Sequence, residues 1–134
     1  MQLTTRQFAD TVLLTVAGRV DHRTAGELEQ ALGTVMAPAG VGQGAVVLDF
    51  SGVEYISSVG LRVLMVAGKQ KRGREASFAI VGLQPVVAEI FAISRFDRVL
   101  VVHADVAGAL AQCSPSARAA WQAAEAPPGA SSPP

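Results

Sequence analysis

The sequence predicts a single α/β domain, in which a small mixed β-sheet has about four helices packed against it. Three observations support this prediction. The chain has 134 residues, half of them hydrophobic, which suits one core and leaves no room for a second domain. Strand-like and helix-like patterns alternate along it, as in sheets covered by helices. Residues 45–50 form an apolar run rich in β-branched side chains, which is typical of a buried parallel strand.

The amino-terminal part predicts a strand pair followed by a helix. Residues 2–9 and 11–18 are strand-like runs separated only by Asp10, so we expect them to pair antiparallel at an edge of the sheet. A capping-box pattern at 24–27 then predicts the start of a helix, which ends before the Pro and Gly of 38–40. Its apolar positions share one face. They are Leu28, Leu32, Val35 and Met36.

The central part predicts a strand, a turn and a second helix. After the strand 45–50, Ser51 and Gly52 are expected to turn the chain. The helix then begins near Ser57 and ends before Gly73, with basic residues in its last turn, where they suit the helix dipole. One apolar face comprises Leu61, Leu64, Met65 and Gly68. A second stripe of Val59, Val63 and Val66 is either a partner contact or is buried under a neighbouring helix.

The carboxyl-terminal part predicts two more strands and two more helices. A fourth strand is expected at 77–83 and a fifth at 100–103. Between them, Pro85 begins a helix that packs through Val86, Ile90 and Phe91 and is broken at 94–97. Asp105 is expected to cap a short helix over 106–112.

These elements predict a domain over residues 1–112. Residues 113–125 are Ala-rich and predict a weak helix, in which Trp121 packs locally. Residues 126–134 contain only Ala, Pro, Gly and Ser and predict a disordered tail. The glycine-rich segment 40–44 lacks the ending of a phosphate-binding loop and is expected to be a flexible connection.

Composition argues against several classes of function. Eleven basic and eleven acidic residues cancel, so no broad field exists to hold nucleic acid or an anionic membrane. No apolar run approaches the ~20 residues that span a bilayer, and the first residues lack a signal-peptide pattern, so we expect a cytoplasmic protein without membrane insertion.

The sequence also gives little support for catalysis. Cys113 is the only cysteine and is expected to be a free thiol, without disulfide or metal. His22 in a turn and His103 at a strand end are expected to be solvated or locally hydrogen-bonded, and share no motif with a nucleophile. We therefore expect no enzyme activity, no metal and no cofactor.

Ser57 and Ser58 are the most informative polar residues, because they lie where the second helix begins. Free backbone N–H groups at a helix amino terminus bind anions, so a phosphate on either serine would be stabilised there. Serine is also a favoured N-cap residue, and capping alone would explain the pattern.

An ordered set of segments resembles the STAS domain of bacterial anti-sigma factor antagonists, over Leu3 to Gln112. The set comprises 18–28, which begins Gly18-Arg19-Val20-Asp21, then the strand 46–53, then Ile56-Ser57-Ser58-Val59-Gly60-Leu61. The resemblance implies that Ser58, two residues before the Gly-Leu pair, is phosphorylated by a kinase that is also the anti-sigma factor. The unphosphorylated protein would sequester this kinase and free a sigma factor for transcription, and a phosphatase would reset the switch.

The sequence departs from the family pattern at two positions. Ser57 occupies a position where the family commonly has Asp, which makes it an alternative acceptor, and Val59 replaces a small residue. Asp21 matches an acidic position of the family and is either a partner contact or a loop residue bonded to the backbone. The expected partner-binding residues are Asp21, Ser57, Ser58, Val59, Gly60, Arg62 and Val63.

Other roles stay open. A single STAS domain could also be a structural subunit docked on the nucleotide-binding component of a lipid-transport ABC complex, and Ser58 would then mainly cap the helix. A third alternative is a small-ligand sensor that binds a phosphate-bearing metabolite at the same helix end. Self-association as a weak homodimer is a further possibility.

Overall fold

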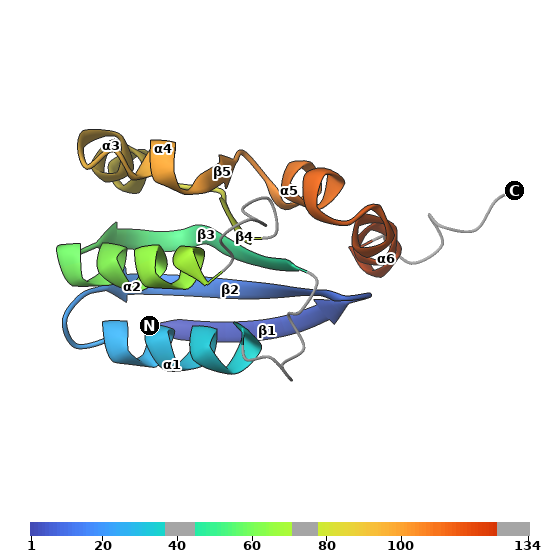
Figure 1. The fold of residues 1–134 in the computed structure, drawn as a ribbon, viewed down its shortest axis with the longest axis horizontal. Helices are drawn as coiled ribbons and strands as arrows, with labels where there is room; N and C mark the ends of the chain where they lie inside the picture. The colour runs from blue at the N-terminus through green and yellow to red at the C-terminus, as the bar shows by residue number, and fades with distance from the viewer. Residues whose placement is uncertain (37–44, 71–77, 126–134) are drawn as a thin grey trace, which may run out of the picture.

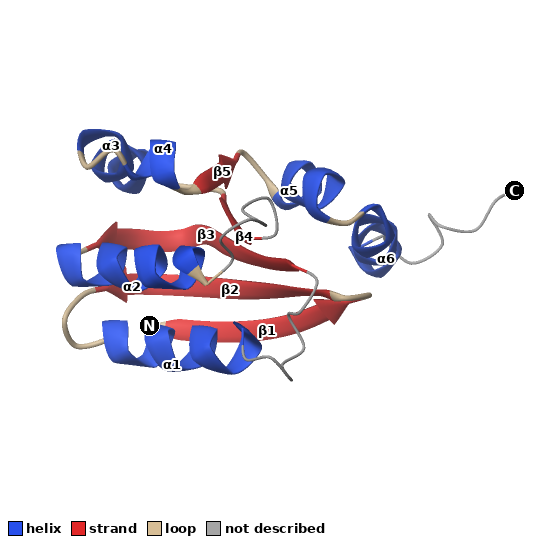
Figure 2. Ribbon diagram, in the orientation of Figure 1, coloured by secondary structure: helices blue, strands red, loops and turns tan. Residues whose placement is uncertain are grey.

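The computed structural model describes residues 1–36, 45–70 and 78–125, and within them a mixed sheet carries helices on both faces (Figures 1 and 2). The strands are β1 (Gln2–Phe8), β2 (Thr11–Val20), β3 (Ala45–Ile56), β4 (Phe78–Val81) and β5 (Val101–His103). The helices are α1 (Ala25–Met36), α2 (Ser58–Lys69), α3 (Pro85–Ile93), α4 (Phe96–Val99), α5 (Val106–Cys113) and α6 (Pro115–Glu125). The predicted α/β class is confirmed.

The strands lie in the sheet in chain order, β1-β2-β3-β4-β5. As predicted, β1 pairs antiparallel with β2 at an edge, whereas the pairs from β2 to β5 are all parallel. Parallel neighbours end at the same side of a sheet. The carboxyl ends of β2 and β3 therefore meet, and the connections to α1 and α2 both start there.

Side chains from the two faces of the sheet form two separate buried clusters. On the first face, inward residues of β2, β3 and β4 pack against α1, α2 and α3, whose buried residues include Leu28, Leu64 and Phe91. On the second face, Leu13 and Val47 lie under α5 and α6. The nearly unbroken apolar run of β3 follows from this two-sided burial.

The predicted turn at Ser51 and Gly52 is wrong, because β3 continues through both residues to Ile56. Its pairing with β2 shifts register twice, between Thr15 and Ala17 and between Gly18 and Arg19 of β2. At each shift β3 contains one residue more than β2 opposite, which is a β-bulge.

The bulges change which residues of β3 face the core. Phe50, Val53 and Ile56 are all buried, at a spacing of three residues where an ordinary strand would give two. The alternating pattern of a strand therefore ends at Phe50, and the Ser51-Gly52 pair that follows looks like a turn. Gly52 is needed for another reason: a Cβ on it would lie 2.8 Å from the Cβ of Ala17 on β2.

The predicted helices form, with one correction of phase, which concerns α3. In α2, Leu61 and Leu64 are buried as expected. Val63 is buried too, with 8% of its surface exposed, which agrees with the second interpretation of the valine stripe, burial under a neighbouring helix. In α3, Val86 is 56% exposed and Val87 packs inward with Phe91 instead, because Val87 lies four positions before Phe91 and so shares its helix face.

The break after α3 is also more structured than predicted. Arg95 adopts a left-handed conformation with φ of 61° and is followed by the short helix α4, which no sequence pattern indicated. Downstream, the predicted cap of α5 is confirmed, since a carboxylate oxygen of Asp105 accepts the Gly108 N–H at 2.8 Å.

Helix α6 packs against the second face of the sheet. Ala117 is fully buried there, Trp121 is partly buried against the same cluster, and Arg6 of β1 pairs with Glu125 at 2.6 Å. The division of the chain at residue 112 stays a prediction. The expected flexible connection at 40–44 and the expected disordered tail at 126–134 lie outside the described residues.

Replacement of Gly52 by Ala should destabilise the domain. The new methyl group would also lie 3.2 Å from the Cα of Ala17, so backbone atoms must move, and we expect a loss of about 1–3 kcal/mol in the free energy of unfolding by urea. Gly33→Ala is the matched control. A Cβ at Gly33 of α1 meets nothing within 4 Å, so this variant should gain about 0.5–1 kcal/mol. Equal stability of the two variants would contradict the proposed tight approach of β2 and β3.

Candidate functional site

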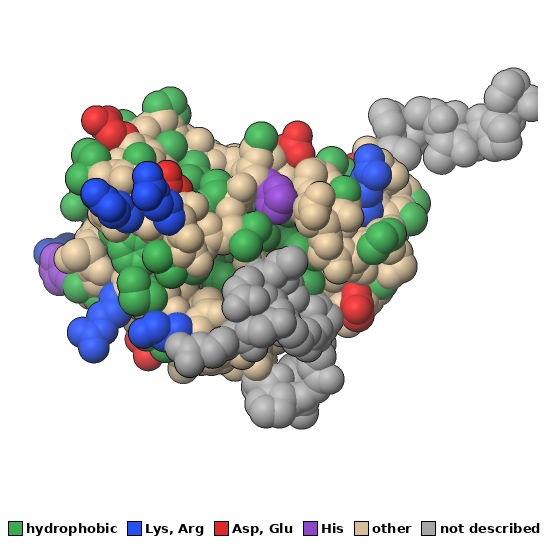
Figure 3. All heavy atoms as spheres, turned by 45° about the horizontal axis from the view of Figure 1, so that its top comes forward, with side chains coloured by type: hydrophobic (Ala, Val, Ile, Leu, Met, Phe, Trp, Pro, Cys, Tyr) green, Lys and Arg blue, Asp and Glu red, His purple; other side chains and the backbone are tan. Residues whose placement is uncertain are grey.

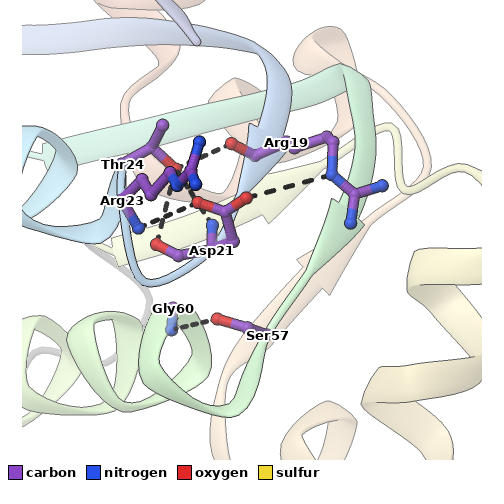
Figure 4. Close-up of polar contacts among 6 residues, drawn as sticks. All are labelled: Arg19, Asp21, Arg23, Thr24, Ser57 and Gly60. Carbon is purple, nitrogen blue, oxygen red and sulfur yellow. Dashed lines mark hydrogen bonds and ion pairs between the residues drawn. The ribbon is translucent and has the colours of Figure 1, made fainter.

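The candidate site lies where β2 and β3 end and α2 begins (Figure 4). The N–H of Ser57, directly after β3, donates a hydrogen bond of 2.8 Å to the carbonyl of Val20, the last residue of β2. A Cβ on Gly60 would lie 2.7 Å from Val20 Cγ1 and 2.8 Å from Ile56 Cγ1. The first turn of α2 therefore rests directly on the two strand ends, and only glycine fits at position 60.

Ser57 is the N-cap of α2. Its backbone is extended, and its hydroxyl oxygen accepts the N–H of Gly60 at 3.3 Å. Its carbonyl accepts the N–H of Leu61 at 2.9 Å. Ser57 is half-buried. The capping role that the sequence left open between two serines belongs to Ser57.

Ser58 is the first residue of α2 and is exposed. None of the hydrogen bonds found among the described residues uses its hydroxyl. The unpaired N–H groups of the first helical turn and the positive end of the helix dipole lie beside it. An incoming enzyme can reach this hydroxyl, and a phosphate placed on it would lie in a favourable field.

Asp21 begins the turn that leads from β2 to α1. One of its carboxylate oxygens accepts the N–H of Arg23 at 2.9 Å, and its carbonyl accepts the N–H of Ala25 at 2.8 Å. The hydroxyl of Thr24 accepts the Asp21 N–H at 2.9 Å and donates to the Arg19 carbonyl at 2.8 Å, so it closes this turn instead of capping the first turn of α1. Asp21 is therefore a loop residue bonded to the backbone, which was one of the two interpretations of this position.

The same hydrogen bonds act on the acidity of Asp21. The pKa of Asp21 is held below its ordinary value, mainly by the hydrogen bond from the Arg23 N–H. The Thr24 hydrogen bonds and the nearby His22 lower it further, and together these effects outweigh partial desolvation, which raises it. The carboxylate thus stays ionised beside the start of α2.

Arg19 and Tyr55 form a contact that the sequence did not indicate. The guanidinium of Arg19 lies 4.6 Å from the centre of the Tyr55 ring, and its Nε lies 3.9 Å from a carboxylate oxygen of Asp21. Arg19 and Tyr55 are opposite each other in the sheet only because the two bulges together shift the register by two residues. A register without bulges would have placed a different residue beside Arg19.

A groove of about 440 Å³ runs between α1 and α2 from this edge. The lining residues of this α1–α2 groove are Glu29, Leu32, Gly33, Met36, Val59, Arg62, Val63, Val66, Ala67 and Gln70. Val59 and Val66 are 47% and 50% exposed, so both add apolar surface to this groove. The buried Val63 lies in the groove wall and also belongs to the core.

The predicted partner-binding residues therefore divide by exposure. Ser58, Val59 and Arg62 are exposed, and Asp21 and Ser57 are partly so. Gly60 and Val63 are buried, so they shape this surface and cannot supply its main contacts. The correction for Val63 has a simple cause, since α1 packs across that side of α2.

The remaining polar candidates do not join this site. His103 ends β5 and lies in line with Val81 of β4 and Asp49 of β3. Asp49 is well before the end of β3 at Ile56, so His103 is away from the site. The Nε2 of His103 is buried and lacks a hydrogen-bond partner among the described residues, contrary to the prediction. Cys113 is half-buried, and burial raises the pKa of its thiol.

Charges and possible metal ligands are dispersed. The face in Figure 3 carries both acidic and basic side chains, and neither sign covers it. In the part of the chain that the structure describes, no three His, Cys, Asp or Glu side chains are grouped as a metal ion would require. No described helix combines the length and the apolar character needed to cross a bilayer.

Known proteins resemble this chain in sequence and in fold. Residues 3–102 match the family model described as "Mlab, STAS domain". BtrV of Bordetella bronchiseptica, provisionally named an anti-sigma factor antagonist, is 35% identical over 96 residues, which cover 72% of this chain and 80% of BtrV. The anti-sigma-F factor antagonist RsfB of Mycobacterium tuberculosis is 39% identical over 69 residues, and the match spans 52% of this chain and 53% of RsfB.

Solved structures show the same fold. An anti-sigma factor antagonist from Mycobacterium paratuberculosis superposes with a TM-score of 0.73 at 28% identity, covering 84% of this chain and 92% of that one. An antagonist-like protein from Thermotoga maritima has a TM-score of 0.74 at 19% identity, covering 83% and 93%, and this likeness concerns the fold alone.

The two serines should differ in their effect on stability. Ser57→Ala removes the acceptor for the Gly60 N–H, so we expect a loss of about 1 kcal/mol in the free energy of unfolding. Ser58→Ala removes an exposed hydroxyl and should change it by less than about 0.5 kcal/mol. Urea unfolding followed by circular dichroism measures both values. The opposite ranking would assign the cap to Ser58.

Asp21 should make stability depend on pH in one direction. Because its pKa is lower in the folded protein, its ionised form contributes stability that is present above the unfolded value of about 3.9 and is lost as the pH falls through the folded value. The melting temperature of the wild type should therefore exceed that of Asp21→Asn near pH 7, and the difference should shrink below about pH 4. A difference that grows on acidification would refute this sign.

Proposed function

This chain belongs to the STAS domain family, and we propose that it is an anti-sigma factor antagonist whose partner binding is switched by phosphorylation of Ser58. In its unphosphorylated form it sequesters an anti-sigma factor serine kinase in the cytoplasm and so favours sigma-factor-dependent transcription. Phosphorylation releases the kinase, and a phosphatase restores the first state. The chain itself is the substrate and does not catalyse these steps.

One observation carries the proposal: the serine at the position expected from the family is exposed at the start of α2, with its hydroxyl outside the capping network. The names of BtrV, RsfB and the mycobacterial structure support the antagonist class. Exposure supports the choice of acceptor, because a kinase must bring the hydroxyl within bonding distance of a phosphoryl donor.

Ser58 is a better acceptor than Ser57 for a structural reason. The Ser57 oxygen is already bonded to the Gly60 N–H, so modification there would disturb the cap. Modification of Ser58 leaves the cap intact. The fold is therefore the same in the two states, and the switch acts on the surface.

The neighbouring surface explains how a phosphate would release a partner. Val59, next to Ser58, and Val66, two turns further along α2, expose apolar area, and a partner that covers Val59 also desolvates position 58. Desolvation costs little for a serine hydroxyl, whereas a phosphate carries nearly two negative charges that would lose their hydration. Burial of such a group without a matching cation weakens binding strongly.

Affinity capture with Ser58→Ala and Ser58→Asp baits from a lysate of the native host tests the proposal. We expect an anti-sigma kinase, identified by mass spectrometry, to be held by the Ala bait and its affinity for the Asp bait to fall by at least about tenfold, a change of about 1.4 kcal/mol. Phosphopeptide mapping of the protein from the same cells should assign the phosphate to Ser58.

Ser116→Asp provides the matched control. Ser116 is also an exposed serine in the first turn of a helix, α6, and the neighbouring Ser114 accepts the Ala117 N–H at 3.3 Å, much as Ser57 accepts that of Gly60. This variant should hold the kinase as the wild type does. Transporter subunits retained equally by all baits would overturn the antagonist function and favour the structural role in an ABC complex.

A further inference from the structure

Arg62 is the charged side chain placed one helical turn after Ser58. The two residues are four positions apart in α2, so they lie on the same side of the helix, and both are exposed. Arg62 also lines the α1–α2 groove together with Val59 and Val66. Arg62 therefore borders both the groove and the first turn of the helix.

Helix geometry directs this side chain toward Ser58. The Cα–Cβ bonds of a helix tilt toward its amino terminus, so a long side chain covers the turn before its own position. An anion four residues before a cation is also the favourable order for a pair on one helix. Arginine can bind a phosphate through two parallel N–H donors, whereas a neutral hydroxyl offers it little.

The other charged groups near this edge are less suited or already engaged. Arg19 stacks on Tyr55 and approaches Asp21. Asp21 itself accepts the Arg23 N–H, and His22 and Arg23 are exposed in the adjoining turn. Glu29, which α1 contributes to the groove, is an acidic residue near Arg62, but no ion pair between them is formed within 4 Å.

We propose that Arg62 is the intramolecular cation that binds a phosphate on Ser58. The inference takes from the proposed function only that Ser58 is the modified residue. Phosphorylation then has two effects on one surface: it adds a dianion at position 58, and it draws the guanidinium away from the α1–α2 groove. For a partner that binds the α1–α2 groove, the surface therefore loses a positive charge at the groove and gains negative charge at position 58.

The second ionisation of the phosphate provides the test. Phosphoserine is inserted at position 58 of the full chain during translation, and its pKa is measured by ³¹P NMR titration in the wild type, Arg62→Gln and Arg62→Lys. A bound cation favours the dianion, so we expect the pKa to rise by at least about 0.3 pH unit in Arg62→Gln. Arg62→Lys, which keeps the charge, should keep most of the original value.

Arg23→Gln is the matched control, because it removes an exposed arginine from the adjoining turn and leaves its backbone N–H bond to Asp21 in place. Its phosphate pKa should stay at the wild-type value. An unchanged pKa in Arg62→Gln, or an equal rise in Arg23→Gln, would overturn the proposal. The titration needs no kinase, so failure of the capture experiment and failure of this inference are separate results.

Discussion

The close approach of α2 to the ends of β2 and β3 is the constraint on which the rest of the site depends. Gly60 allows the helix to rest on Val20 and Ile56, and the hydrogen bond from the Ser57 N–H to the Val20 carbonyl fixes the same junction. Because Ser57 is held there as the cap, the next residue must face outward at the helix start. The exposure of Ser58 is thus a consequence of backbone packing beneath it.

The sequence predicted the class of the fold because most of its elements have an ordinary period. The strand-like composition of residues 11–18 and the three-to-four spacing in α1 depend only on local geometry, and both predicted elements are present. The continuation of β3 was missed because two bulges replace the period of two by a spacing of three. Helix α4 was missed because four residues are too few to show any period.

The candidate site was predictable in position and less so in detail. The pair Ser57 and Ser58 could be placed at a helix start from sequence, but only the hydrogen bond to Gly60 distinguishes the cap from the exposed residue. The contact of Arg19 with Tyr55 depends on strand register, which no local pattern encodes. Val63 was ambiguous because a valine stripe looks the same whether a partner or another helix covers it.

The exposed contact between Arg6 and Glu125 joins residues 119 positions apart and links α6 to β1. Closing so long a loop costs more chain entropy than pairing neighbouring elements, and contacts of this kind slow folding. The surface around Ser58, by contrast, is built from β2, α1, β3 and α2, which are consecutive in the chain. During synthesis, the half of the domain that would meet a partner can therefore begin to assemble while the helix that closes the opposite face is still inside the ribosome.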